Sequence, residues 1–425
     1  MKFHFGRLPV YLITCVVAST LVPITGFAAD YPLTLSEAER LALGVEPGQQ
    51  ELLAYADAFE READAADRLP DPTMRVGLSN FPVGGGGFSA EAMTQAQVGF
   101  RQAFPRRAIR AASANRFRAL ALARRADADA RGLAVLESAR RAWLDIYFWQ
   151  RTTSLLHESK LLFGDLVRVT ESLYAEGRRT QHDVLRAQLE LSRIDDRLLR
   201  AAEAKAAAQA RLSEWLGQDA YRPVAKKLPD WTSIPPLQAL QQALRQHPAV
   251  QAADENIAAG DAGVTSAREQ RKPGWALDVG YGFRDGFMPD GMQRSDMVSV
   301  NVVVDLPFFG RARQDSKLAA ALGNRSAAVS AKNRLIASLE SQLRAEHARW
   351  NELSQRLELF QSSILLLSDE QAGAALSAYR SDAGDFADVT RSYVDALDAR
   401  IEYTKIQVEH AQSFASLAAL GGLSR

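Results

Sequence analysis

The stretch VSVNVVVDLPFFGRARQ, residues 298–314, alternates apolar and polar residues, stops at Leu306-Pro307 and then becomes polar. The stretch QVGFRQAFPRRAIRAAS, residues 97–113, makes the same change. Alternation with a period of two indicates a strand, whereas the alanine-rich continuation indicates a helix. The sequence therefore predicts two places, about 200 residues apart, where a strand runs directly into a helix.

Four segments of the first half of the chain resemble segments of the second half at offsets of about 201–205 residues. The pairs are 69–79 with 271–281, 97–105 with 299–307, 172–184 with 377–389, and 215–217 with 419–421. A period this long indicates the duplication of one large unit. We expect repeats at 29–227 and 228–425, with the proline-rich segment 226–237 between them.

Each repeat is expected to contain the same elements in the same order, namely a first helix, two strands, a very long helix and a last helix. The expected helices are 35–68, 106–176, 181–216, 236–270, 311–381 and 385–420, and the strands are about 73–80, 95–104, 275–283 and 297–305. The fold class is mostly α with a small β part, built from a duplicated long-helix coiled-coil unit.

Residues 1–28 combine Lys2 and Arg7 with an apolar run and end in Gly26-Phe27-Ala28. This pattern predicts a secretory signal peptide, with a membrane anchor as the alternative. Cys15, the only cysteine, lies in this segment, so we expect no disulfide or Cys–metal site after cleavage. The 51 basic and 51 acidic residues balance, which disfavours a nucleic-acid partner.

The four expected strands each have one apolar face and one small, polar or charged face. This pattern is typical of an outer-membrane barrel strand, with lipid outside and water inside, but a soluble sheet covered by helices fits it equally well. Because no later run of 18 apolar residues exists, a membrane-spanning chain would need a closed barrel. Four strands cannot close one, since about eight are the practical minimum. We favour three chains and twelve strands, with the lumen candidates Arg75, Arg101, Asp278 and Asn301.

Apolar residues recur every seven positions in both long helices, as coiled-coil seams require. The seam positions are Phe148, Leu155, Leu162, Val169, Leu166 and Leu173 in the first helix, and Leu343, Trp350, Leu357, Ile364, Leu353, Phe360 and Leu367 in the second. A helix of about 70 residues is on the order of 100 Å long. The last and first helices of about 35 residues each could stack end to end along it, and such helices could form a hollow tube.

Taken over essentially the whole chain after residue 28, the sequence resembles the TolC-like outer-membrane efflux proteins. The repeat, the strand–Pro–long-helix order and the Tyr-x-x-x-x-Gly-x-x-x-Asp-Val pattern at 379–389 carry this resemblance. The segments LPDPTMRVGLSNFPV, MTQAQVGF and RQAFP look like the subgroup paired with heavy-metal RND pumps.

The resemblance implies a homotrimer in the outer membrane of a Gram-negative bacterium, with a 12-stranded β-barrel on an α-helical barrel that extends into the periplasm. It also implies a passive exit duct of a tripartite pump, whose partners are a periplasmic adaptor and an inner-membrane RND transporter. The adaptor is expected to dock near 172–186 and 377–391. Heavy-metal cations would be the cargo only if the subgroup resemblance holds.

The resemblance also implies a periplasmic gate. Asp388 matches an acidic position that rings the family's entrance, and Tyr379 and Asp183 match positions that pair by a hydrogen bond. Arg391 stands where the family often has a second acid, so only a single acidic ring is expected. Helix capping is the alternative reading, because Thr180-x-x-Asp183 and Asp385-x-x-Asp388 both resemble capping boxes.

No catalytic, cofactor or metal constellation is expected. The six histidines are scattered, and the glycines at 84–87 form no phosphate-binding motif and are predicted to lie in an extracellular loop. The sequence thus favours a channel over an enzyme. The alternative function is a periplasmic or surface coiled-coil structural protein that spans no membrane.

Overall fold

The computed structural model describes residues 31–44, 46–381 and 383–421, so the predicted signal peptide and Cys15 lie outside the described residues. The first half contains α1 (Leu35–Gly44), α2 (Pro47–Ala66), β1 (Thr73–Ser79), β2 (Gln95–Phe104), α3 (Arg107–Ala175), α4 (Gln181–Leu216) and the 3-10 helix η1 (Gly217–Tyr221). The second half contains α5 (Leu237–Leu244), α6 (Pro248–Glu269), β3 (Trp275–Phe283), β4 (Met297–Val304), the 3-10 helix η2 (Pro307–Gly310), α7 (Arg311–Leu359), the π-helical turn η3 (Phe360–Ile364), α8 (Leu365–Arg380) and α9 (Phe386–Gly421).

The first helix of each half is broken in two, although the sequence predicted one continuous helix in each place. Pro47 and Pro248 occupy the first turns of α2 and α6, where a missing N–H costs nothing, and each disfavours helical backbone in the residue before it. Glu46 and His247 are therefore extended and serve as N-caps, accepting hydrogen bonds from backbone N–H groups of their own helices.

The two long helices differ. Helix α3 is continuous over 69 residues, whereas the second long helix contains the π turn η3 between α7 and α8. A π turn accommodates an additional residue, so the residues after it are rotated relative to a regular heptad. Leu343 and Leu353 are buried as expected, but Leu367 is exposed, and the buried positions resume at Ala372 and Tyr379. The prediction of Leu367 as a buried seam residue was wrong for this reason. The prediction of Val169 as a seam residue of α3 was also wrong, because Val169 is 43% exposed in the single chain.

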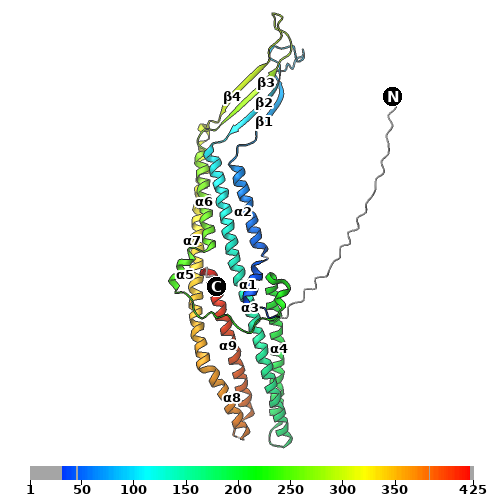
Figure 1. The fold of residues 1–425 in the computed structure, drawn as a ribbon, viewed down its shortest axis with the longest axis vertical. Coiled ribbons are helices and arrows are strands. Elements are labelled where there is room, and N and C mark those ends of the chain that lie inside the picture. The colour runs from blue at the N-terminus through cyan, green and yellow to red at the C-terminus, as the bar shows by residue number, and fades with distance from the viewer. Residues whose placement is uncertain (1–30, 45, 382, 422–425) are drawn as a thin grey trace, which may run out of the picture.

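The four predicted strands form one antiparallel sheet in the order β1-β2-β3-β4. Each repeat contributes one hairpin, and the two hairpins join where β2 pairs with β3, for example at Gly99↔Gly280. Strands β1 and β4 are the edges, and each pairs with only one neighbour in the described chain. In Figure 1 the sheet stands at one end of an elongated molecule, beyond the ends of the helices.

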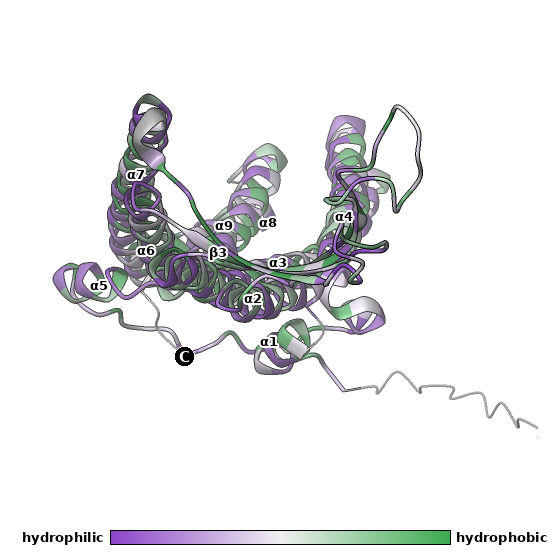
Figure 2. Cartoon of the chain, turned by 90° about the horizontal axis from the view of Figure 1, so that it is seen from above, coloured by the Kyte–Doolittle hydropathy of each residue, from purple (hydrophilic) through white to green (hydrophobic). Residues whose placement is uncertain are grey.

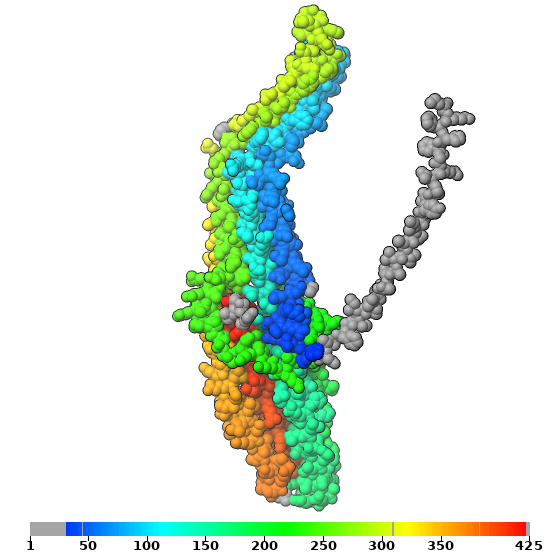
Figure 3. Space-filling view, viewed as in Figure 1, coloured from blue at the N-terminus to red at the C-terminus, as the bar shows by residue number. Residues whose placement is uncertain are grey.

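Helix α3 is the central helix on which the other helices of the first half pack. It packs on α2 and α6 toward the sheet and on α4 and α9 toward the opposite end, so the shorter helices follow one another along its length (Figures 1 and 3). Seen from above, α3, α6 and α2 form a curved wall, with α7 and α4 standing at its two sides (Figure 2). Among the described helices, none is both long and apolar enough to cross a bilayer.

A core halfway along α3 ties the N-terminal segment and the linker to the long helices. Trp143 is fully buried and donates its indole N–H to the Leu33 carbonyl at 3.0 Å. Beside this core, the Arg131 guanidinium donates to the carboxylate of Glu46 at 2.9 Å. This hydrogen bond holds the pKa of the Glu46 carboxyl below its usual range, against the opposing effect of burial.

Candidate functional site

One face of the sheet, defined here as the apolar face, consists of aligned cross-strand rows of large apolar side chains. Its middle rows are Met74–Phe100–Val279–Val300 and Val76–Val98–Tyr281–Val298. These side chains are 37–71% exposed, and in the described part of the chain no helix packs on them. A contiguous apolar surface of this kind marks contact with another protein or with a membrane.

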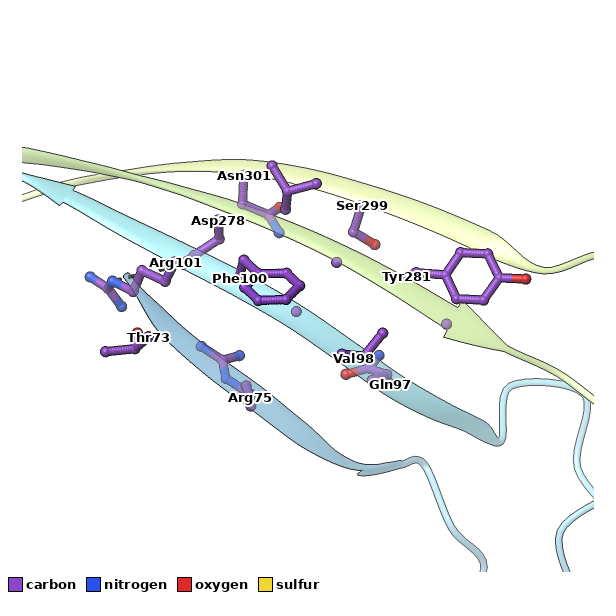
Figure 4. A pocket seen from close by; sticks show the side chains of 14 residues that line it. Thr73, Arg75, Gln97, Val98, Phe100, Arg101, Asp278, Tyr281, Ser299 and Asn301 are labelled. Atoms are coloured by element: carbon purple, nitrogen blue, oxygen red, sulfur yellow. Dashed lines mark ion pairs between the residues drawn. The ribbon is translucent and has the colours of Figure 1, made fainter. Parts of the chain in front are cut away.

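The opposite, polar face carries small and polar side chains around a hollow of about 160 Å³ (Figure 4). Its rows are Thr73–Arg101–Asp278–Asn301 and Arg75–Gly99–Gly280–Ser299. The structure thus brings all four lumen candidates to one face of the sheet. The Arg101 Nε lies 3.7 Å from the Asp278 carboxylate, forming an ion pair within this face.

The loops beyond the sheet, 80–94 and 284–296, are joined to each other. Arg294 donates to the backbone carbonyls of Ser89, Glu91 and Asp285 at 3.0–3.1 Å. Ser89 also donates its hydroxyl to the Asp285 carboxylate at 2.6 Å. These bonds connect the hairpin loop of one repeat to that of the other.

The opposite end of the molecule, defined here as the helical tip, consists of the α3–α4 and α8–α9 connections. Arg179, in the first connection, donates to the Tyr379 carbonyl at 3.0 Å, and its guanidinium lies 4.4 Å from the centre of the Tyr379 ring. Tyr379 is only 2% exposed and also contacts Phe386 at the start of α9. Arg197 of α4 pairs with Asp398 of α9 at 2.6 Å. These contacts hold the two helix pairs together.

The acidic residues of the tip occupy the first turns of their helices. Asp183 completes a capping box with Thr180, accepting from its N–H at 3.4 Å and from its hydroxyl at 3.1 Å. Asp388 lies in the first turn of α9 and is exposed, and so is Arg391 one turn later. The structure therefore places Asp183 in its own helix cap, while Tyr379 lies against Arg179.

A groove of about 280 Å³ separates α3 from α8 and α9 near this tip. Its apolar wall is formed by Leu162, Leu166, Val169, Leu173, Leu376, Tyr379, Phe386 and Tyr393. Asp165, Arg178, Arg179 and Arg380 supply the charged part of its lining. Leu166, Tyr379 and Phe386 of this wall are almost fully buried within the chain.

No family model and no curated protein matches the sequence. Solved structures do match: the outer membrane protein VceC from Vibrio cholerae is 18% identical, with a TM-score of 0.76 over 91% of this chain and 96% of its own. The outer membrane channel CmeC from Campylobacter jejuni is 14% identical, with a TM-score of 0.77 over 91% and 85%. CusC, whose structures concern transmembrane channel formation, is 15% identical, with a TM-score of 0.77 over 90% and 91%.

This chain shares its fold with solved outer-membrane channel proteins. Within the described chain the sheet has two edge strands, β1 and β4, and each pairs with only one neighbour. Among the tip residues, sequence reasoning missed Arg179. Its partner Tyr379 lies 200 residues away, and no local pattern distinguishes Arg179 from the neighbouring Arg178.

Proposed function

We propose that three copies of this chain form an outer-membrane channel, the passive exit duct of a tripartite efflux pump. The observation that carries the proposal is the sheet, which none of the described helices covers and which is apolar on one face and polar on the other. Lipid would contact the apolar face, and water would fill the space inside the polar face. Edge strands β1 and β4 would pair with those of neighbouring copies, so that twelve strands close without a free edge.

The helices would continue the duct into the periplasm as an α-helical barrel. Transport through this chain would be downhill, and the energy would come from an inner-membrane transporter of the RND class. A periplasmic adaptor would dock at the helical tip, where the groove between α3 and the α8–α9 pair is partly apolar. Heavy-metal cations remain a hypothesis for the cargo that rests on the subgroup resemblance.

The helical tip would be the periplasmic gate. Three exposed Asp388 carboxylates around the axis would attract cations, and the Arg179–Tyr379 contact would help to keep the tip closed. In planar bilayers, Asp388→Ala should lower cation selectivity and weaken block by divalent cations, whereas Arg391→Ala should not weaken this block. Unchanged selectivity and unchanged block in Asp388→Ala would show that Asp388 lies away from the constriction.

The decisive experiment is fractionation of the full-length protein expressed in a Gram-negative host. We expect an SDS-resistant, heat-modifiable trimer in the outer-membrane fraction that conducts ions in planar bilayers. A product that is soluble without detergent and does not conduct would overturn the proposal. It would favour the alternative, a coiled-coil structural protein, which leaves the exposed apolar face without an explanation.

A further inference from the structure

The polar face of the sheet has an uneven distribution of charge. Within the four strands only Arg75, Arg101 and Asp278 are charged, and all three lie on this face. In Figure 4 both arginines come from β1 and β2, whereas Asp278 comes from β3. Each chain therefore carries one more positive than negative charge on the polar face of its strands.

The ion pair between Arg101 and Asp278 leaves Arg75 as the charged strand residue that is available to interact with a solute. Arg101 lies 3.7 Å from Asp278 Oδ1, an oxygen that is buried and accepts no hydrogen bond in the described chain. Arg101 thus compensates the only carboxylate within the four strands. Arg75 is exposed, and among the described residues its side chain forms neither an ion pair nor a hydrogen bond.

The neighbours of Arg75 leave its guanidinium uncovered. Its row continues with Gly99, Gly280 and Ser299, none of which can reach across the hollow to neutralise or shield it. A Cβ on Gly99 would make only an ordinary van der Waals contact, 3.4 Å from the Val279 carbonyl, so the row beside Arg75 is bare backbone without being crowded. A guanidinium presents several N–H donors in a planar arrangement that fits carboxylate, sulfonate and phosphate oxygens.

We infer that Arg75 makes the barrel part of the channel favour anionic solutes, in particular those with carboxylate, sulfonate or phosphate groups. This inference rests on the proposed trimeric barrel, in which three Arg75 side chains would form a ring. The three positive charges would act across the lumen, and a Debye length of about 10 Å at 0.1 M salt weakens their effect. The ring should therefore raise the anion-to-cation permeability ratio about two- to fourfold.

The test is the reversal potential of single channels in a KCl gradient around 0.1 M. Arg75→Gln should lower the chloride-to-potassium permeability ratio about two- to fourfold, while Arg75→Lys, which retains the charge, should leave it near the original value. The difference should shrink near 1 M salt, where the Debye length is about 3 Å. Because Asp388 would act in series at the other end, the comparison is between variants and not between absolute ratios.

A second variant makes the test independent of how well Arg75→Gln folds. Ser299→Asp adds a negative charge in the same cross-strand row and should also lower the ratio. Conducting channels whose ratio is unchanged in both Arg75→Gln and Ser299→Asp would overturn the inference and leave the channel intact. An original protein that forms no channel at all would instead overturn the proposed function.

Discussion

Substituting Val300 by arginine tests whether the apolar face contacts lipid. Val300 lies in β4, in the middle row of that face, and its side chain is 65% exposed in the single chain. In water such a substitution on an exposed strand would change the free energy of unfolding by only about 0.5 kcal/mol. In a bilayer, arginine near the midplane of a barrel costs about 2–4 kcal/mol, which three copies raise to about 6–12 kcal/mol per trimer.

The neighbouring residue provides the matched control. Ser299 precedes Val300 on the same strand and projects from the polar face, so Ser299→Arg should change the free energy of unfolding by only about 0.5 kcal/mol. The assay is the fraction of heat-modifiable trimer in outer membranes, together with urea unfolding of protein folded into lipid vesicles. Equal trimer yields and equal unfolding midpoints for Val300→Arg and Ser299→Arg would refute the assignment of the apolar face to lipid.

Three further predictions concern the helices. Arg179→Ala removes the contact with Tyr379, worth about 0.5–2 kcal/mol, and should raise the open probability of single channels; an unchanged open probability would remove Arg179 from the gate. Leu343→Ala should lower the free energy of unfolding by about 2–5 kcal/mol because Leu343 is fully buried, whereas Leu343→Met should cost less than about 1.5 kcal/mol in the same denaturation experiment. The pKa of Glu46 is lowered in the folded chain, so the stability that its carboxylate contributes is complete above its unfolded-state pKa of about 4.3. This contribution is lost as the pH falls through the folded-state pKa. In urea titrations, Glu46→Gln should therefore lower the free energy of unfolding by about 1 kcal/mol at pH 7 and by much less at acidic pH.

Local patterns were sufficient for the strands and for the long helices, because both follow from periodicity within short windows. The breaks before Pro47 and Pro248 were missed, although each proline disfavours helical backbone in the residue before it and is therefore a local signal of a helix boundary. The additional residue in the π turn 360–364 was also missed, because a heptad count assumes regular helix geometry throughout. The heptad count therefore predicted that Leu367 is buried, whereas it is exposed.

The sequence by itself determined that four strands have one apolar and one polar face, and that Arg75, Arg101, Asp278 and Asn301 lie on the polar side. Alternation is a property of each strand alone, so no partner is needed to read it. Only the tertiary structure decided that the four strands join into one sheet that the chain's own helices leave uncovered. It also decided that Asp278 is paired with Arg101, that Arg75 has no ion-pair partner among the described residues, and that Arg179 contacts Tyr379. These facts depend on contacts between residues far apart in the chain, and the spacing of apolar residues within a short segment contains no information about such contacts.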